Sequence, residues 1–412
     1  LTTVAASTNY AAENTLKLGD GTKLAGASLA TAPVGPTPMI DAADAGVEGA
    51  TDPGLCAPDS LDPAKVEGKM VVCARGTYAR TDKSLEVERA GGVAMVLVNI
   101  TPGSLDADAH FVPTVHLDDT DGPKVYDYLA SAGDKATGQI LLGNRVGTTT
   151  PVPQIADFSS RGPTEVADGD ILKPDIAAPG VSILAAVAPP SNNDRSYDFY
   201  SGTSMAAPHI AGLAAFLQGL HPQWSPSKIK SAMMTTAQNT LTADGKQSTD
   251  VFAQGAGEVD PQKYLDPGLF VTASAQQWKG FLTDQGLDTG VRAVSARDLN
   301  TPALADGGTA GPISFTRTFS ASTIGSWSIS ASVPGFTLTT SPARIASKRV
   351  GDLITVTFTF TRTTAPVSEW ATGYVKLTGP TKLRLPVALR PDRKSTRLNS
   401  SHTDISRMPS SA

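Results

Sequence analysis

Residues 201–212 read SGTSMAAPHIAG, and Ser204 within this segment is a candidate nucleophile. A serine hydroxyl attacks a carbonyl carbon only when a base takes its proton and nearby donors stabilise the negative oxygen that forms. The small residues after Ser204 predict a helix that begins here, whose free N–H groups and dipole would favour negative charge. A serine that merely caps a helix fits the same pattern, so the segment alone leaves both interpretations open.

The neighbours of Ser204 suit a nucleophile at a helix start. Gly202 allows a sharp turn and leaves room for a substrate to approach. Pro208 is predicted to lie within the first turn, where its missing N–H costs little. The alanines and glycines that follow predict a thin helix that can lie close to neighbouring strands. The supporting motif residues are Gly202, Thr203, Met205, Ala206 and Pro208.

No other residue is well placed to activate this serine. His209 lies five positions farther along the predicted helix, about 140° around its axis, and is interpreted as structural. His221 precedes a proline and is interpreted as a helix-end residue. The D-T-G segment at Asp288 lies well beyond the serine and is interpreted as a turn. With no base assigned, Ser204 would retain only its own N–H as a catalytic donor.

Length and composition limit the class of protein. The chain has 412 residues, enough for two to four domains, with 40% hydrophobic and 18% charged residues. A formal net charge of −5 argues against a nucleic-acid or anionic-membrane partner. No apolar run approaches the roughly 20 residues that span a bilayer. Residues 1–18 lack the basic and apolar regions of a signal peptide, so we expect the chain to begin within a longer protein.

The pattern of predicted elements divides the chain into units. Short apolar runs around a helical segment predict a small α/β unit, alternating strands and helices predict a layered α/β domain, and regularly spaced β-branched strands predict an antiparallel β-sandwich. Ser225 and Pro226 predict the start of a second helix in the α/β domain. The predicted bounds are 1–20 with 136–270 for the α/β domain, 21–135 for the small unit, 271–294 for a connector, 295–390 for the sandwich and 391–412 for a tail.

The small unit contains both cysteines of the chain and two histidines. Cys56 and Cys73 are separated by 17 positions and could be free buried thiols or a disulfide. A disulfide that closes a loop of this size would contribute roughly 3 kcal/mol. His110 and His116 flank a predicted strand and are interpreted as ordinary edge residues. Two cysteines without clustered histidines give no zinc motif.

Several segments together resemble one family. GTSMAAPHIAGLAA resembles the nucleophile segment of the subtilisin-like serine proteases, and the match continues through HPQWSPSKIKSAMMTTA. IADFSSRGP (155–163) and LKPDIAAPGVSILAA (172–186) resemble two further family segments in the expected order. GAGEVDPQKYLDPGL (255–269) resembles the closing segment, except that Glu258 stands where a histidine is common. The resemblance implies a partial parallel-sheet domain in which Ser204 is the nucleophile and its backbone N–H forms part of the oxyanion hole.

The same resemblance suggests identities for the accessory units. LDPAKVEGKMVVCARG is similar to the protease-associated domain that is inserted in large members of the family. The unit at 295–390, preceded by DLNTP, resembles their fibronectin type III-like domain. The resemblance also implies a secreted protein, and secretion favours a disulfide between Cys56 and Cys73.

The resemblance also shows what the chain lacks. In this family the aspartate and histidine of the triad, and the asparagine of the oxyanion hole, precede the inserted domain. None can be assigned here, so we expect the C-terminal portion of an endopeptidase for protein or peptide substrates, inactive alone and without a metal or cofactor. The alternative is a binding or adhesion protein that kept the scaffold. Retention of the motif at 202–204 favours the enzyme.

Two further segments are interpreted from their composition and position. The tail at 391–412 is polar and low in hydrophobic residues, which predicts disorder. Its string KSTRLNSSHTDISRMPSSA resembles a peptide translated from sequencing-adapter DNA, so we interpret it as non-native and exclude His402 from functional argument. Asn99 begins an N-glycosylation sequon, N-I-T. It ends an apolar strand, which favours partial burial of the sequon.

Overall fold

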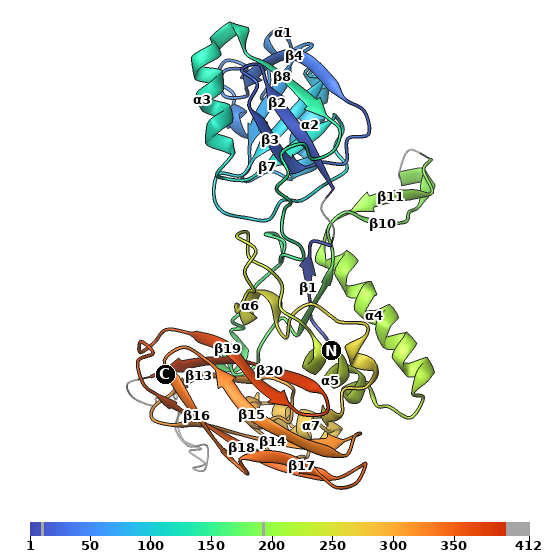
Figure 1. The fold of residues 1–412 in the computed structure, drawn as a ribbon, viewed down its shortest axis with the longest axis vertical. Helices are drawn as coiled ribbons and strands as arrows, with labels where there is room; N and C mark the ends of the chain where they lie inside the picture. Colours follow the sequence, from blue (N-terminus) through green and yellow to red (C-terminus); the bar gives the residue numbers. More distant parts are fainter. Residues whose placement is uncertain (10–11, 192–193, 393–412) are drawn as a thin grey trace, which may run out of the picture.

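Three units follow one another along the long axis of the molecule (Figure 1). The computed structural model describes residues 1–9, 12–191 and 194–392. A β-barrel lies at one end, a central layer around α4 (Thr203–Leu220) lies in the middle, and two β-sheets lie at the other end. The predicted tail lies outside the described residues from position 393 onward, and His402 with it.

The barrel contains seven strands in the closed order β2-β3-β7-β6-β5-β4-β8. The pairs β4–β5, β5–β6 and β6–β7 are parallel, and the remaining pairs are antiparallel. Its elements are β2 (Glu13–Leu18), β3 (Lys23–Ala27), β4 (Val34–Asp41), α1 (Pro63–Val66), β5 (Met70–Ala74), α2 (Arg80–Arg89), β6 (Ala94–Val98), β7 (Thr114–Leu117), α3 (Gly122–Ala132) and β8 (Thr137–Leu141).

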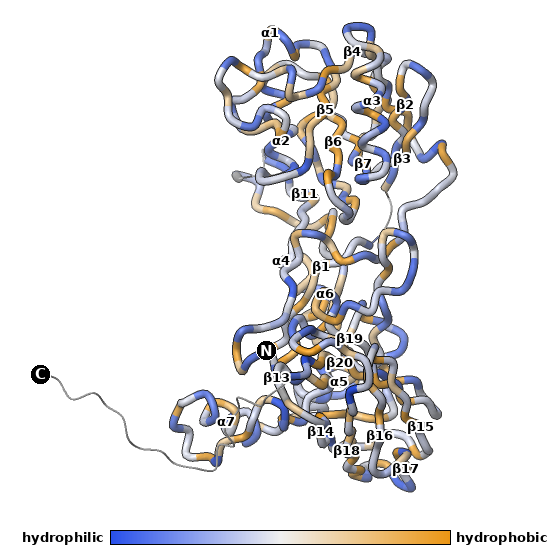
Figure 2. The backbone as a smooth tube through the Cα atoms, turned by 90° about the vertical axis from the view of Figure 1, so that its left-hand side faces the viewer, coloured by the Kyte–Doolittle hydropathy of each residue, from blue (hydrophilic) through white to orange (hydrophobic). Residues whose placement is uncertain are grey.

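Strands β5 and β6 are buried on both faces, which explains their continuous apolar sequences (Figure 2). Successive side chains of a strand point to opposite faces of its sheet. Accordingly, Met70 and Val72 belong to one apolar cluster. Val71 and Cys73 belong to another, which includes Val87 of α2. The barrel therefore carries apolar cores on the two faces of these strands.

The barrel extends beyond the predicted bounds 21–135 at both ends. Strand β2 pairs with β3 and with β8, so residues 13–18 and 137–141 belong to the barrel and not to the flanking domain. A closed barrel leaves no strand edge unpaired. Closure of the barrel pairs strands that are far apart in the chain, such as β2 and β8, so the local sequence pattern did not reveal the true bounds of this unit.

The two cysteines lie in the barrel and form a disulfide. Cys56 and Cys73 are bonded, with their Cα atoms 5.7 Å apart. Both side chains are fully buried, in the cluster that also contains Val71 and Val87. The bond therefore ties the segment before α1 to the central strand β5.

The central layer combines one parallel strand pair with two helices. β1 (Val4–Ser7) pairs with β9 (Ile176–Pro179), and α4 and α5 (Pro226–Thr236) share an apolar cluster with them. The predicted helix start is confirmed, because Ser225 caps α5 by accepting from the Lys228 N–H over 3.3 Å. The other elements of the layer are β10 (Ile183–Ala186), β11 (Tyr197–Tyr200) and α6 (Val251–Gln254), whereas α7 (Ala275–Asp284) lies at the end of the molecule that holds the two sheets (Figure 2).

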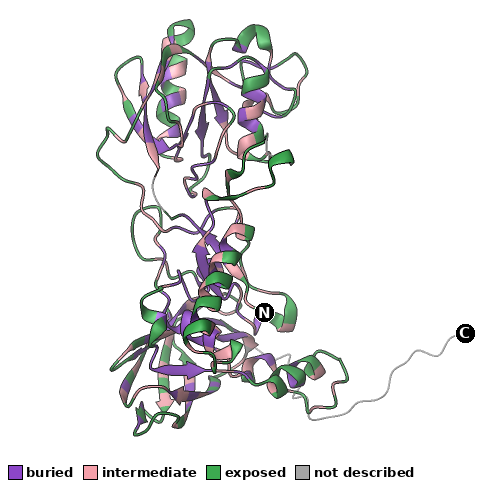
Figure 3. Ribbon diagram, turned by 90° about the vertical axis from the view of Figure 1, so that its right-hand side faces the viewer, coloured by how far each residue is buried: buried purple, intermediate pink, exposed green. Residues whose placement is uncertain are grey.

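One face of the long apolar helix α4 is open to solvent (Figure 3). Phe216 and Leu220 on this helix are 53% and 52% exposed. In the described part of the chain, β1 has β9 as its single strand neighbour within a sheet. No helix among the described residues is long and apolar enough to cross a membrane.

The third unit consists of two sheets that share one apolar core. The sheets have the orders β12-β14-β18-β16 and β13-β20-β19-β15-β17, and side chains of both enter the same cluster. Their strands are β12 (Leu269–Val271), β13 (Leu304–Thr309), β14 (Ile313–Ala321), β15 (Gly325–Ser332), β16 (Phe336–Ser341), β17 (Arg344–Ser347), β18 (Leu353–Arg362), β19 (Ala371–Thr378) and β20 (Lys382–Pro391).

Two features of this unit differ from the predicted antiparallel sandwich at 295–390. β12, which ends at the first residue of the predicted connector, pairs with β14 and adds an edge strand. β13 pairs with β20 in parallel. The predicted connector at 271–294 contains the helix α7, whose capping box at Ser274 and Gln277 was overlooked.

The disulfide leads to a prediction about stability. Replacing both cysteines, Cys56→Ser with Cys73→Ser, should lower the free energy of unfolding by about 3 kcal/mol, because the unfolded chain regains the freedom of the closed loop. Denaturant unfolding of both proteins under non-reducing conditions measures the difference. A reducing agent should destabilise only the parent chain, and equal stability of the two oxidised proteins would contradict the prediction.

Candidate active site

The N-terminus of α4 presents Ser204 to solvent on a firmly packed base. The N-cap residue Gly202 donates its N–H to the Gly180 carbonyl oxygen over 2.7 Å. A Cβ atom at Gly180 would lie 2.6 Å from Ala6 and 2.9 Å from the Gly202 oxygen, so only glycine permits this close approach. Ala206 is fully buried beneath the first turn, whereas Ser204 is exposed. The packing of neighbouring residues thus fixes where Ser204 lies.

Pro208 does not lie in the first turn, as we expected from the sequence. Helix α4 begins at Thr203, so Pro208 lies inside the helix, beyond its first turn. Proline has no N–H, so the carbonyl of Ser204, four residues earlier, receives no helical hydrogen bond from this position. The prediction was wrong because it placed the start of the helix too late.

Ser204 lines a pocket of about 1170 Å³ that is shared by two units. The barrel contributes residues 75–81 and 108–111, and the hairpin β10–β11 and the loop after it contribute 198–202. Aromatic and charged side chains both occur in the wall, so the pocket can hold the side chains and the backbone of a peptide. The wall includes Arg75, Tyr78, Arg80, Asp108, His110, Phe111, Phe158, Arg195, Asp198, Phe199 and Tyr200.

The one histidine in this wall is a poor base. Nδ1 of His110 lies 3.1 Å from Ser84 Oγ. Because Ser84 Oγ donates to the Thr81 carbonyl, Nδ1 carries the hydrogen and Nε2 is left as an acceptor. Burial, assisted by the positive charge of Arg80, lowers the pKa of His110 to about 4. The imidazole is therefore neutral at neutral pH and binds a proton only weakly.

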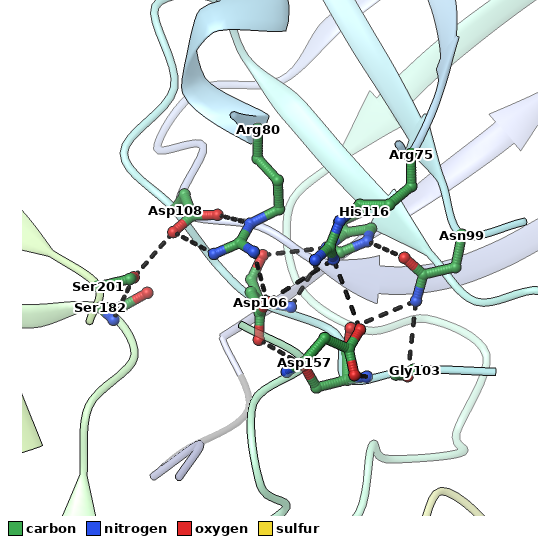
Figure 4. A network of polar contacts seen from close by, with 11 residues as sticks. Arg75, Arg80, Asn99, Gly103, Asp106, Asp108, His116, Asp157, Ser182 and Ser201 are labelled. Carbon is green, nitrogen blue, oxygen red and sulfur yellow. Dashed lines mark hydrogen bonds and ion pairs between the residues drawn. The ribbon is translucent and has the colours of Figure 1, made fainter. Parts of the chain in front are cut away.

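His116 is also buried, in a polar cluster inside the barrel (Figure 4). Its Nε2–H donates to Asn99 Oδ1 over 2.7 Å, and its Nδ1 accepts from the Asp106 N–H over 3.2 Å. Burial lowers the pKa of His116 to about 3. The prediction that His116 is an edge residue was wrong, because the segment that contains Asp106 folds back over β7 and buries this side chain. His110 lies before β7 and is half-buried in the pocket wall.

The remaining histidines considered from the sequence have structural contacts. His209 donates from Nδ1 to the Met205 carbonyl oxygen one turn earlier, over 2.8 Å. His221 stacks on Trp224 with ring centroids 4.0 Å apart and planes inclined by 8°. Neither forms a hydrogen bond with Ser204, in agreement with the sequence interpretation.

The D-T-G segment forms a turn, as predicted, because Asp288 Oδ1 accepts from the Gly290 N–H over 3.0 Å. Among the residues that the structure describes, none forms a hydrogen bond with Ser204 Oγ. The described chain holds no group of three or more His, Cys, Asp or Glu side chains that could bind a metal ion. Within the described part of the chain, the site therefore presents an exposed serine at a helix N-terminus without a base bonded to it.

Sequence reasoning missed a buried ionic cluster beside the pocket (Figure 4). Arg80 Nη1 lies 2.9 Å from Oδ2 of Asp106, which is fully buried. Burial raises the pKa of Asp106 to about 6, although Arg80 opposes this change. Arg80 also binds Asp108 through Nε. The run D-A-D-A-H at 106–110 was the available signal, since paired acids in a mainly apolar region need a cation.

Glu258, the position where the family commonly has histidine, is buried in the central layer. It is 7% exposed and bridges to Ala177 and Gln238 through its backbone. Its Oε2 atom has no hydrogen-bond partner among the described residues. Burial raises the pKa of Glu258 to about 7, and the neighbouring Ser7 hydroxyl only partly offsets this effect. Glu258 therefore lies away from the pocket wall and is a titratable group of the core.

Comparison with known proteins identifies related sequences. The profile of the Subtilase family matches residues 53–257. Subtilisin-like protease SBT1.7 of Arabidopsis thaliana is 36% identical over 403 residues, covering 86% of this chain and 53% of the relative. Subtilisin-like protease SBT5.4 of the same plant is 39% identical over 278 residues, covering 63% and 36%. The chain thus spans about half the length of these relatives or less.

Similar solved structures include two proteases with limited overlap. The psychrophilic subtilisin-like protease Apa1 from Pseudoalteromonas sp. AS-11 is 15% identical with a TM-score of 0.22, covering 64% of this chain and 49% of that one. Fervidolysin from Fervidobacterium pennivorans is 14% identical with a TM-score of 0.23, covering 78% and 56%.

Burial of Asn99 leads to a prediction about glycosylation. Asn99 is 3% exposed, and its side-chain amide donates to the Ser104 carbonyl while its oxygen binds His116. A glycan on this amide would break both contacts, so we expect no modification at Asn99 in a eukaryotic secretory host. Mass spectrometry before and after glycosidase treatment measures occupancy, and a glycan mass at this site would contradict the prediction.

The raised pKa of Glu258 leads to a prediction about pH dependence. The pKa of Glu258 is about 7 in the folded protein, whereas the ordinary pKa of a glutamate is 4.5, so the stabilising contribution is complete below pH 4.5 and is lost as the pH rises through 7. Glu258→Gln should therefore remove this loss, and its stability relative to the parent should increase by up to about 3 kcal/mol between pH 4.5 and pH 8. Urea unfolding across this range measures the effect.

The exposed residue Glu88 on α2 provides the matched control. Glu88→Gln makes the same chemical change without burial, and its stability should follow the parent at every pH. If the free energies of unfolding of Glu258→Gln and the parent changed in parallel with pH, the Glu258 carboxyl would not be the group that causes the pH dependence.

Proposed function

We propose that this chain belongs to the Subtilase family, whose profile matches residues 53–257, and that it is the C-terminal portion of a secreted serine endopeptidase whose nucleophile is Ser204. The observation that carries the proposal is the position of Ser204: exposed, in the first turn of α4, and in the wall of a pocket large enough for a peptide. The substrates are proteins or peptides.

The chemistry follows from this position. Ser204 Oγ attacks the carbonyl carbon of the scissile peptide bond, the amine leaves with a proton, and a seryl acyl-enzyme remains that water then hydrolyses. N–H groups in the first turn of a helix lack intrahelical acceptors, so the Ser204 N–H can donate to the oxyanion. The dipole of α4 favours the same negative charge.

The remaining catalytic groups are proposed to come from parts of the protein outside this chain. Three observations support this proposal. No described residue bonds to Ser204 Oγ, the chain spans 53% of its relative SBT1.7, and α4 exposes large apolar side chains. An apolar groove of about 390 Å³ between β1, α4 and α5 offers a surface for the missing portion. Without those groups, the chain alone is inactive.

The accessory units have roles that the architecture supports. We infer that the barrel is the protease-associated domain, because it is inserted between β1 and β9 and its loops line the pocket. We infer that the two-sheet unit is the fibronectin type III-like domain, which packs on the central layer. Tyr374 of that unit, for example, donates to the Gly255 carbonyl oxygen over 3.2 Å.

Active-site labelling tests the proposed nucleophile. A fluorophosphonate probe should not label this chain, because loss of the base and its partner reduces reactivity by several orders of magnitude. The full-length protein should be labelled at Ser204, and Ser204→Ala should abolish both labelling and peptidase activity. Gel fluorescence and peptide mapping measure the modification.

Ser225→Ala provides the matched control, because Ser225 also begins a helix but lies away from the pocket. Labelling of the full-length protein should survive this change. Robust labelling of the chain alone would refute its incompleteness. A complete gene without upstream D-[ST]-G and H-G-T segments would instead favour a binding or adhesion protein.

A further inference from the structure

Ser201 connects the barrel to the segment that carries Ser204 (Figure 4). Its hydroxyl donates to Oδ1 of Asp108, in the barrel, over 2.8 Å. The same oxygen accepts from the Ser182 N–H, in the central layer, over 3.0 Å. A single hydroxyl therefore links two units by using both its donor and an acceptor position. Ser201 immediately precedes Gly202, the N-cap of α4.

Asp108 is held rigidly by Arg80. Nε of Arg80 binds Asp108 Oδ2, and Nη2 donates to Oδ1 over 3.2 Å. Asp108 is only 7% exposed. Burial alone would raise the pKa of Asp108, but the hydrogen bond and charge of Arg80 outweigh burial and lower it, with smaller contributions from His110 and Ser201. The carboxylate is therefore ionised at neutral pH and accepts a charge-assisted hydrogen bond from Ser201.

The opposite side of the nucleophile segment is bound to the central layer. The Gly202 N–H donates to the Gly180 oxygen over 2.7 Å, and Ser182 donates to Ser201. Gly180 and Ser182 both precede β10, so these contacts come from one short loop. The bond from Ser201 to Asp108 adds a restraint from a different unit, 93 residues away in the chain.

From this arrangement we propose that Asp108, clamped by Arg80, is a positioning residue for the nucleophile: it fixes the Ser201 side chain and thereby the direction in which α4 begins. The inference rests on the proposed function of Ser204. Because Ser204 lies three residues after Ser201, a shift at Ser201 moves both the attacking hydroxyl and its N–H donor. A displacement of about 1 Å at a reacting group can reduce a rate about 100-fold. The barrel thus forms part of the pocket wall and also positions the nucleophile for its attack on the peptide bond.

Hydrogen exchange tests the restraint without any need for activity. In this chain, Ser201→Ala removes the hydroxyl and leaves the Arg80–Asp108 pair intact, so the fold is retained. Amides of residues 199–206 should exchange about tenfold faster than in the parent chain, since a bond to a charged group is lost. Ser201→Thr keeps the hydroxyl and should restore slow exchange.

Kinetics of the full-length protein test the consequence for catalysis. Ser201→Ala should lower kcat about tenfold or more while KM changes less than about twofold, because the change removes only one hydroxyl from the pocket wall but misplaces the nucleophile. Ser201→Thr should recover most of kcat. Asp108→Ala, which removes the acceptor itself, should lower kcat at least as much as Ser201→Ala.

Asp157→Ala is the matched control, because Asp157 forms another contact between the barrel and the central layer. Its Oδ1 accepts from the Ser104 N–H over 3.1 Å, and Asp157 is not part of the pocket wall. This variant should leave kcat and the exchange of 199–206 near the parent values. Unchanged exchange and kcat in Ser201→Ala, or an equal loss in Asp157→Ala, would overturn the positioning role. Persisting activity in Ser204→Ala would instead refute the proposed nucleophile.

Discussion

The pairing of Arg80 with two buried carboxylates, Asp106 and Asp108, constrains the conformation of the pocket wall. Asp106 and Asp108 have little or no contact with water, and an uncompensated charge at such depth is strongly destabilising, by about 3–5 kcal/mol when one partner is lost. Arg80 compensates both. Since the guanidinium is planar and its N–H groups point in fixed directions, it also holds the segment 106–108 in one conformation. Because Arg80 and Asp108 line the pocket, this cluster also fixes the shape of that part of the pocket wall.

Stability and orientation are supplied by different interactions in this molecule. The barrel, the central layer and the two-sheet unit each bury an apolar cluster of their own. Burial of apolar surface contributes much of the stability of each unit but is non-directional. It therefore does not specify the orientation of a side chain at the edge of a unit. Hydrogen bonds and ion pairs between the barrel and the central layer are directional. The bond from Ser201 to Asp108 is one of them, and it restrains the residue directly before Gly202.

Local features of the fold were accessible from the sequence. Ser225 and Pro226 predicted the start of α5, because a capping side chain and a proline without N–H both favour that position. The small residues around Ser204 predicted a helix that packs closely on strands. Ala206 does lie against the core, but Ala207, Ala211, Gly212 and Ala215 lie on the exposed face of the helix. The motifs at 155–163 and 172–186 resembled the family whose profile matches residues 53–257.

What the sequence by itself determined was chemistry and local conformation: a serine at a helix start, its small neighbours, and strands where side-chain periodicity required them. Tertiary structure alone decided which distant segments meet. It paired β2 with β8, buried His116 against Asn99, and brought Asp108 to Ser201. The physical reason is the distance along the chain over which each interaction acts. Backbone preferences and periodicity act over a few residues, whereas barrel closure and the pairing of buried charges depend on contacts that no local pattern specifies.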